Sequence, residues 1–288
     1  MYDFLIGPFA EFDFMRRALI GVLALGVGAG PVGVLMMLRR MSLAGDAMAH
    51  AILPGAAVGF LAAGLNLFAM TIGGLVAGFA VALGAGAVAR ATEMKEDAAL
   101  AAFYLISLAL GVLLVSLRGS NVDLLHVLFG TVLALDDATL LLIVAISSFT
   151  LIVLAALWRP MVLESVDPGF LRSVSRAGAP SHLAFLALVV LNLVGGFHAL
   201  GTLLAVGLMM LPAATARFWA RDLTAMVAIS VLVACASGVI GLLVSYHTGV
   251  PSGPAIILVA GGAYALSVLI GPVGGLLLRL APRRHLEA

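Results

Sequence analysis

Long apolar stretches, separated by short polar or charged breaks, dominate the chain. A helix that crosses a membrane needs about 20 mostly apolar residues, and the pattern predicts nine such spans. The predicted spans are 15–38, 43–64, 67–89, 98–117, 138–158, 181–198, 200–218, 224–246 and 253–278. Basic residues, glycine or proline mark the breaks, as is typical of turns. The sequence therefore predicts an all-α polytopic membrane protein in which residues 1–288 form a single transmembrane domain.

The distribution of basic residues predicts the orientation of these spans. With nine spans and a cytoplasmic C-terminus, only Arg16, Arg17 and Arg118 of the 15 Lys and Arg residues lie outside. Basic residues accumulate in the cytoplasmic loops of membrane proteins, so we expect a cytoplasmic C-terminus and an outer N-terminus. The boundary at 198–201 is the weakest, since its glycine-bearing turn could equally be a kink within one irregular segment. A single span there would place basic residues on both sides, which favours nine spans.

Two segments at the outer side are not expected to cross the membrane. Residues 1–14 read as a short amphipathic segment that lies on the outer surface. Residues 119–135 are apolar but too short to cross, which predicts an outer re-entrant or interfacial segment.

The inner loop at 159–180 is the longest polar stretch of the chain. Within it, Asp167 can cap a helix whose first residue is Pro168, and Gly178 can end that helix. We expect a short amphipathic helix parallel to the inner surface, with a plain connecting loop as the alternative.

The composition supports a membrane protein and excludes several classes of function. Apolar residues make up 63% of the chain and charged residues 10%, whereas an ordinary soluble domain is about 45–50% apolar and about 25% charged. The net charge of +1 gives no electrostatic footprint for a nucleic acid, so lipid is the expected surrounding. Cys235 is the only cysteine, which excludes a disulfide framework and a zinc cluster built on cysteines.

One acidic residue and one histidine stand out in the apolar sequence between Arg40 and Arg90: Asp46 and His50. A carboxylate inside a membrane segment costs about 2.5–3.5 kcal/mol, so it is expected to face the protein interior and to have a partner. A spacing of four residues places both side chains on one helical face. An Asp oxygen and a His nitrogen together offer half of a site for a divalent metal ion, and two such pairs would supply four ligands.

A structural role for this pair is the alternative. Asp46 follows Ser42 and Gly45, so it could cap a helix near the inner surface with His50 as its hydrogen-bond partner. Pro54 and the glycine after it predict that this helix is broken or kinked. Because transporters place ion sites at irregular helices within the membrane, the break favours the functional interpretation.

The remaining polar candidates lie on the outer side of the predicted topology. His126, His198 and His247 could line an entry vestibule, or each could simply lie at the membrane interface. Asp136 and Asp137, at the outer mouth of the fifth span, could attract cations, or they could complement the dipole of a helix N-terminus.

Motifs for enzyme chemistry are absent from the sequence. It contains no H-E-x-x-H, no G-x-S-x-G, no P-loop and no dinucleotide-binding fingerprint. We therefore expect no enzyme activity and no permanently bound cofactor. If ATP drives transport by this protein, another chain must bind the ATP. A stand-alone secondary metal transporter or exporter is one alternative, although no inverted repeat supports it. A membrane enzyme or haem carrier would need paired histidines at matching depth, or a nucleophile with a base, and we find neither.

Residues 42–55 read Ser-Leu-Ala-Gly-Asp-Ala-Met-Ala-His-Ala-Ile-Leu-Pro-Gly. This segment resembles the S-L-x-G-D-A-x-x-H-A-x-L-P-G signature of the ABC permeases for zinc, manganese and iron, which are served by cluster A-I binding proteins. Residues 128–130 are similar to the L-F-G segment of that family, although His126 stands where an aromatic residue is common. Residues 201–217 resemble its G-x-L-L and P-A-A-T-A-R stretch, and residues 248–254 its turn before the last span. The resemblance covers about residues 15–275.

The resemblance implies a fold similar to that of the vitamin B12 importer, a type II ABC importer, with one fewer helix at the N-terminus. It implies a homodimer around the translocation path, two cytoplasmic ABC ATPase subunits and an extracytoplasmic metal-binding protein, in the inner membrane of a bacterium. The transported substrate is then Zn²⁺ first, with Mn²⁺ or iron as alternatives.

The resemblance also assigns roles by position. Asp46 and His50 become the metal-contacting pair of the pathway, doubled across the dimer axis, and the loop 162–179 becomes the coupling helix that docks onto the ATPase. The residues assigned to coupling are Asp167, Pro168, Gly169, Phe170, Arg172, Arg176 and Gly178.

Overall fold

The computed structural model of the chain describes residues 5–41, 44–64, 66–117 and 132–277. All regular secondary structure in these ranges is helical. The helices are α2 (Gly7–Glu11), α3 (Asp13–Leu38), α4 (Ala44–Ala51), α5 (Leu53–Ala63), α6 (Leu67–Ala91), α7 (Glu96–Leu117), η1 (Val132–Ala134), α9 (Asp137–Val166), α10 (Pro168–Val174), α11 (Gly178–Ala216), α12 (Leu223–Thr248) and α13 (Ser252–Ile270). Within the described ranges, eight helical segments are long and apolar enough to cross a membrane. The predicted class, an all-α polytopic membrane protein, is confirmed.

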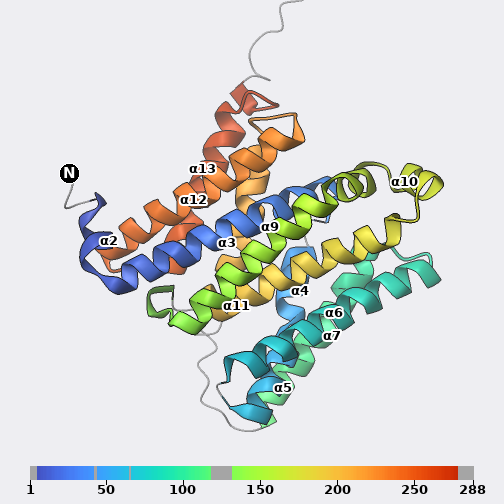
Figure 1. Cartoon of the computed structure of the whole chain (residues 1–288), viewed down its shortest axis with the longest axis horizontal. Coiled ribbons are helices and arrows are strands. Elements are labelled where there is room, and N and C mark those ends of the chain that lie inside the picture. The colour runs from blue at the N-terminus through green and yellow to red at the C-terminus, as the bar shows by residue number, and fades with distance from the viewer. Residues whose placement is uncertain (1–4, 42–43, 65, 118–131, 278–288) are drawn as a thin grey trace, which may run out of the picture.

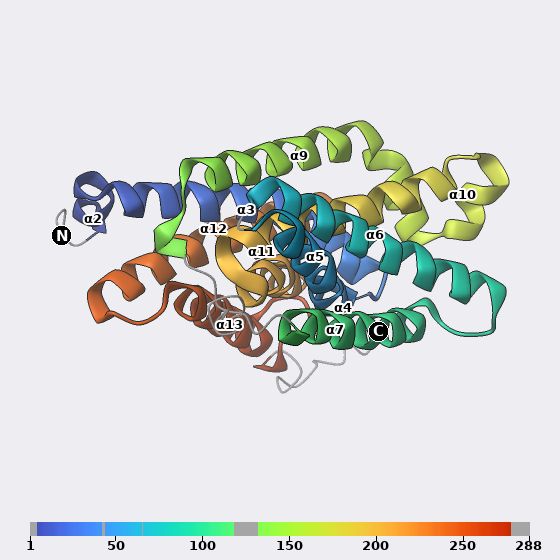
Figure 2. The ribbon, with the colours of Figure 1, turned by 90° about the horizontal axis from the view of Figure 1, so that it is seen from below.

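The helices form three groups around α3. Figure 1 shows α3, α9 and α11 side by side along the long axis of the molecule, and all three pack against one another. Helices α4 to α7 form a second group on one side of this trio, and α12 and α13 form a third group on the other. Helix α10 and the connection between α6 and α7 lie at one end of the molecule, and α2 lies at the opposite end (Figure 2). Helix α10 and the α6–α7 connection therefore lie on one side of the helical spans, and α2 lies on the other.

Helix α3 forms the centre of the core. Its side chains Met15, Val22, Val32 and Leu35 are inaccessible to solvent, and they pack with buried residues of α9, α11 and α12. The outer helices expose large apolar side chains instead, for example Leu258 of α13. This distribution suits a lipid environment, in which the outward face of a helix need not be polar.

Glycine lets α5 and α6 approach at backbone distance. A Cβ atom on Gly55 would lie 1.9 Å from the carbonyl oxygen of Gly73, and one on Gly73 would lie 2.1 Å from the carbonyl oxygen of Gly55. A Cβ atom on Gly59 would likewise lie 2.4 Å from the carbonyl oxygen of Ala69. Small residues are the usual means of close helix packing in membranes, and here they fix the α5–α6 pair.

The second predicted span, 43–64, is two helices. Helix α4 ends at Ala51 and α5 begins at Leu53, with Pro54 in its first turn. The proline ring cannot continue the hydrogen-bonding pattern of the preceding helix, so the predicted break is confirmed.

The sixth and seventh predicted spans form the two arms of α11. Gly201 has φ 81° and ψ 162°, a left-handed conformation that interrupts the helix. A Cβ atom on Gly196 would lie 2.5 Å from the Cβ atom of Ala205, whereas nine residues of straight helix would separate them by about 13 Å. The arms therefore fold back sharply, and the second arm, Gly201–Ala216, is too short to count among the eight candidate spans.

Several predicted boundaries are wrong. Helix α9 continues to Val166 although the fifth span was predicted to end at 158, because the chain absorbs Pro160 by a kink at Leu157 instead of a break. Helix α13 ends at Ile270 and not at 278, since Gly271 precedes a proline and adopts an extended conformation. The sequence pattern does not distinguish a tolerated proline from a terminating one.

The two outer segments are described only in part. Helix α2 falls within the predicted amphipathic segment 1–14 and packs against α3, which begins at Asp13. Of the predicted re-entrant segment 119–135, residues 119–131 lie outside the described residues, and Val132–Ala134 form a short 3-10 helix.

The close contact between α5 and α6 generates a stability prediction. Replacing Gly73 with Ala forces a methyl group against the Gly55 carbonyl, and overpacking of this kind costs about 1–3 kcal/mol. Gly262→Ala is the matched control, because a Cβ atom at that position on α13 meets no described atom within 4 Å. We expect a clearly lower thermal unfolding midpoint in detergent for Gly73→Ala and an unchanged or higher one for Gly262→Ala. Equal midpoints would contradict the close packing of α5 on α6.

Candidate functional site

Asp46 and His50 lie one turn apart on α4. The Nε2 atom of His50 is 3.7 Å from Oδ1 of Asp46, which is longer than a hydrogen bond. The two side chains thus point the same way without satisfying each other. The Asp46 side chain is 63% exposed and that of His50 is 23% exposed. The carboxylate is therefore largely open to its surroundings, whereas the imidazole is mostly buried.

The opposite face of α4 is fixed by methionine side chains. A Cβ atom on Gly45 would lie 3.3 Å from the Met209 methyl carbon and 3.4 Å from that of Met36. Met48, one turn further on, is completely buried. Because α4 buries its glycine and methionine face against α3 and α11, its Asp46 side chain is directed away from the core of the chain.

Helix α7 supports the break that follows His50. The Tyr104 ring lies 5.7 Å from the His50 ring, centroid to centroid. The buried Ser107 hydroxyl donates a hydrogen bond of 3.0 Å to the Ala51 carbonyl, and a Cβ atom on Gly111 would lie 3.2 Å from the Pro54 nitrogen. Tyr104, Ser107 and Gly111 are spaced for one helical face, so a single face of α7 holds the junction of α4 and α5.

Sequence reasoning missed Tyr104 and Ser107. Both are polar positions in the predicted span 98–117, which is otherwise apolar except for Ser116, and their spacing of three residues was the available signal. The pattern of α7 alone does not reveal which helix its polar face contacts, because that depends on the tertiary packing.

The His50 ring carries one nitrogen with no partner. Nδ1 is buried and has no hydrogen-bond partner among the described residues. Buried polar atoms are nearly always paired in folded proteins. The histidine is therefore poorly explained as a merely structural residue.

The described part of one chain does not hold a complete metal site. No group of three or more His, Cys, Asp or Glu side chains comes together within it. Asp46 and His50 offer one oxygen ligand and one nitrogen ligand, which is fewer than any divalent transition metal requires. The ligand set would have to be completed by another copy of the chain or by water.

The predicted outer-side residues have local partners or are dispersed. Asp136 caps α9 and accepts a hydrogen bond of 3.0 Å from the Thr139 amide, and hydrogen bonds from the Thr139 side chain and backbone hold the pKa of Asp136 below its ordinary value. Asp137 forms an ion pair of 3.1 Å with Arg17 of α3. His247 is exposed in the last turn of α12.

Two of the outer histidines cannot be located as side chains. His198 lies in α11 close to the bend at Gly201, and its side chain is not described. His126 lies outside the described residues. The outer vestibule thus remains a prediction.

The predicted inner helix is present as α10, with one changed boundary. Asp167 caps it by accepting a hydrogen bond of 2.9 Å from the Phe170 amide, and Pro168 is its first residue, as predicted. Helix α10 ends at Val174 with Ser175 as its C-cap, so the expected stop at Gly178 is wrong. Gly178 instead begins α11.

Helix α10 lies at one end of the molecule (Figure 2) and exposes apolar side chains there. The side chains of Phe170 and Val174 are exposed, whereas Leu171 is buried and anchors the helix. Gly169 and Arg176 are also exposed, and the Arg172 side chain is not described.

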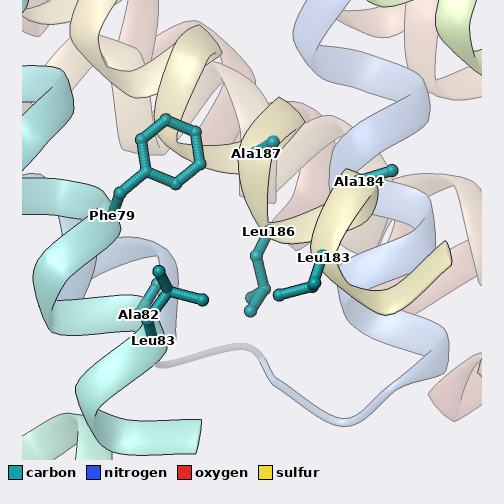
Figure 3. Close-up of a pocket in the computed structure, with 7 residues that line it drawn as sticks. All are labelled: Phe79, Ala82, Leu83, Leu183, Ala184, Leu186 and Ala187. Atoms are coloured by element: carbon teal, nitrogen blue, oxygen red, sulfur yellow. The ribbon is translucent and has the colours of Figure 1, made fainter. Parts of the chain in front are cut away.

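The hollow shown in Figure 3 is no candidate for a metal ion. It encloses about 380 Å³ between α6, which contributes Phe79, Ala82 and Leu83, and four residues of the first arm of α11. All seven lining residues are apolar, and a hard or borderline cation needs oxygen or nitrogen ligands.

Comparisons with known proteins extend over most of the chain. The profile of the ABC 3 transport family matches residues 11–271. The manganese import system permease protein ScaB of Streptococcus parasanguinis is 34% identical over 262 residues, which cover 91% of this chain and 92% of that protein. A probable iron transport system membrane protein of Haemophilus influenzae is 28% identical and covers 93% of this chain and 97% of its own.

A solved structure shares the fold. The structure of PsaBC from Streptococcus pneumoniae in complex with Fab contains a chain that superposes with a TM-score of 0.85 at 30% sequence identity. The alignment covers 97% of this chain and 100% of that one. The overall helical arrangement described above is therefore shared with a solved structure.

The hydrogen bond from Ser107 generates a test of how α7 supports α4. Ser107→Ala leaves the Ala51 carbonyl without its buried donor, which costs about 1–3 kcal/mol. The control is Ser148→Ala, since Ser148 is exposed on α9. We expect the unfolding midpoint of the purified protein to fall for Ser107→Ala only. An unchanged midpoint would show that α7 does not brace the break.

Proposed function

The chain belongs to the ABC 3 transport family and is the permease subunit of an ABC-type metal importer, and on that premise we propose that Asp46 and His50 pass Mn²⁺ across the membrane. Two copies of the chain would face each other across the translocation path. Each copy would contribute one carboxylate and one imidazole to a shared ion.

The observation that carries this proposal is the exposure of Asp46. Its carboxylate is 63% exposed on a helix within an apolar span, and leaving such a group in lipid costs about 2.5–3.5 kcal/mol. A second copy placed on this face of α4 would replace lipid with protein and water. The same placement would bring the two incomplete ligand pairs together.

The chemistry of the pair fits a divalent transition metal. Carboxylate oxygen and imidazole nitrogen both bind Mn²⁺ and Zn²⁺, and Mn²⁺ accepts octahedral coordination in which water fills the remaining positions. Two Asp46 and two His50 side chains would supply four ligands and leave two positions for water. A site that keeps water and has few charges can release its ion, as transport requires.

Manganese is better supported than zinc as the transported ion. The sequence suggested Zn²⁺ first, but the ScaB relative is named as a manganese import permease and the Haemophilus relative as a probable iron transport protein. The ligand pair itself does not discriminate between these ions, so we expect the binding protein to contribute much of the selectivity.

ATP hydrolysis would be supplied by separate subunits. The sequence contains no P-loop, and α10 with its exposed Phe170 and Val174 offers an apolar docking surface at one end of the molecule. We propose that loop 162–179 is the coupling loop that contacts two cytoplasmic ATPases, one under each copy. The end that carries α10 would then be cytoplasmic, together with the C-terminus.

The opposite end would receive the metal ion. The permease would lie in the inner membrane of a bacterium, and an extracytoplasmic binding protein would dock near α2 and the N-terminus of α9. Asp136 and Asp137 lie at this end, and their carboxylates would attract a cation even while they cap α9 and pair with Arg17.

Removal of either ligand tests the metal path. Asp46→Ala and His50→Ala are each expected to lower Mn²⁺ uptake by the assembled transporter by about tenfold or more, since even indirect support of a ligand is worth about 10–100-fold in metal affinity. Asp97→Asn is the control, because Asp97 is an exposed carboxylate in the first turn of α7. Uptake would be measured as ⁵⁴Mn accumulation in proteoliposomes. Normal uptake by both alanine variants, with normal assembly, would refute the site.

A change in α10 tests the coupling loop. Gly169→Asp places a second carboxylate beside Asp167, whose Oδ1 atom would lie 3.3 Å from the new Cβ atom. We expect the number of Mn²⁺ ions transported per ATP hydrolysed to fall, because the docking surface and the helix cap are both disturbed. Gly169→Ala, which adds no charge, is the control. Fully coupled transport by Gly169→Asp would exclude α10 as the docking element.

A further inference from the structure

A cluster of polar and aromatic side chains surrounds the end of α3. Arg39, the C-cap of α3, donates from Nε to the Ser165 hydroxyl at 2.9 Å and pairs through Nη1 with Nδ1 of His182 at 3.0 Å. Its guanidinium carbon also lies 3.9 Å from the centre of the Phe185 ring, which is 1% exposed. One side chain thus contacts three residues from two other helices.

The chemistry of the cluster requires an arginine. A guanidinium group only donates hydrogen bonds, so Nδ1 of His182 accepts and Ser165 accepts as well. The Ser165 hydroxyl in turn donates a hydrogen bond of 2.6 Å to the Met161 carbonyl. The flat guanidinium group can hold two acceptors and stack on an aromatic ring at once, which a lysine ammonium group cannot do.

The partners of Arg39 flank α10 on both sides. Ser165 lies near the end of α9, two residues before the Asp167 cap of α10. His182 lies in the first turns of α11, which begins at Gly178, shortly after the end of α10. Arg39 therefore contacts both α9, which precedes α10 in the chain, and α11, which follows it.

The chain after Arg39 continues to α4, which carries the proposed metal ligands Asp46 and His50. Arg40 adopts a left-handed conformation with φ 58°, and the Met41 amide donates to the Met36 carbonyl at 3.1 Å. The Ala44 amide, at the start of α4, donates to the Met41 carbonyl at 3.1 Å. Backbone hydrogen bonds thereby connect the end of α3 to the start of α4, two residues before Asp46.

We propose that Arg39 is the positioning residue that transmits movement of the coupling loop to the Asp46–His50 pair. When the ATPases displace α10, the ends of α9 and α11 move relative to α3, and the contacts of Arg39 carry that displacement to the start of α4. This inference rests on the proposed function, since it takes α10 as the docking element and Asp46 and His50 as the metal ligands. It adds a residue that touches neither the metal ion nor the ATPase.

The test uses the complete transporter, with ATPase and binding protein, in proteoliposomes. Arg39→Gln removes the positive charge and the guanidinium group that donates to both Ser165 and His182. We expect the Mn²⁺ transported per ATP hydrolysed to fall about tenfold, within the range of ordinary coupling between sites. ATP hydrolysis and ATPase binding are expected to stay within about twofold of the parent transporter. Arg40→Gln removes the same charge at the neighbouring exposed residue and should leave the ratio unchanged. An unchanged ratio in Arg39→Gln would overturn the proposal.

A conservative variant separates bridging from charge. Arg39→Lys keeps the positive charge but cannot hold Ser165 and His182 together, so we expect it to recover less than half of the lost transport ratio. Full recovery would show that charge alone suffices and would overturn the bridging role. If Arg39→Gln does not fold, Ser165→Ala and His182→Phe remove the acceptors one at a time while Arg39 remains. Each should lower the transport ratio, and two normal ratios would contradict the inference.

The outcome also distinguishes this inference from the proposed function. Normal uptake by Asp46→Ala and His50→Ala would remove the metal site itself, whatever Arg39 does. Loss of uptake in those variants and uncoupling by Gly169→Asp, combined with a normal ratio in Arg39→Gln, would refute only the role of Arg39.

Discussion

The ionisable side chain of Asp46, within an apolar span, is the main physical constraint on how this protein can pack in a membrane. Asp46 cannot remain facing lipid at low cost, yet α4 buries its opposite face against methionines of α3 and α11. The chain thus has no orientation of α4 that hides the carboxylate by itself. In the proposed dimer, a second protein surface and a cation would resolve this conflict together, because the ion would neutralise the charge and the second copy would exclude lipid. The exposed carboxylate is thus the observation from which both the proposed dimer and the proposed metal path follow.

Two sets of contacts surround the Asp46–His50 pair: one braces the break after His50, and the other connects the end of α3 to the helices beside α10. Helix α7 braces the break after His50 through Ser107, and close glycine contacts join α5 to α6. Backbone hydrogen bonds tie the start of α4 to the end of α3, and the Arg39 side chain reaches the helices on both sides of α10. In the proposed mechanism, the support from α7 and this junction would let Asp46 and His50 move together when α10 moves.

Much of the fold followed from the sequence because its signals are local. Apolar length located the spans, Pro54 predicted the break in the second one, and Asp167 with Pro168 predicted the start of α10. The boundaries at Arg159 and Gly178 failed, since a proline can be absorbed by a kink and a glycine can begin a helix as well as end one.

The candidate site was only partly predictable. Asp46 and His50 were evident as polar residues at helical spacing, and the family signature supported them. The contacts of Tyr104 and Ser107 with α4, and those of Arg39 with Ser165 and His182, join residues far apart in the chain. Such contacts depend on how the helices pack, and no spacing within one helix encodes them. A single sequence therefore predicted the candidate ligands but not the residues that contact and support the helix carrying them.

The most direct test of the shared site is to count the metal ions held by the purified transporter and to identify their ligands. Electron paramagnetic resonance of bound Mn²⁺, combined with metal analysis, reports both the number of ions per chain and the nitrogen atoms coupled to each ion. We expect one Mn²⁺ for every two permease chains, with nitrogen coupling that disappears when His50 is replaced. One ion held by each separate chain, or nitrogen coupling that persists without His50, would contradict the shared site.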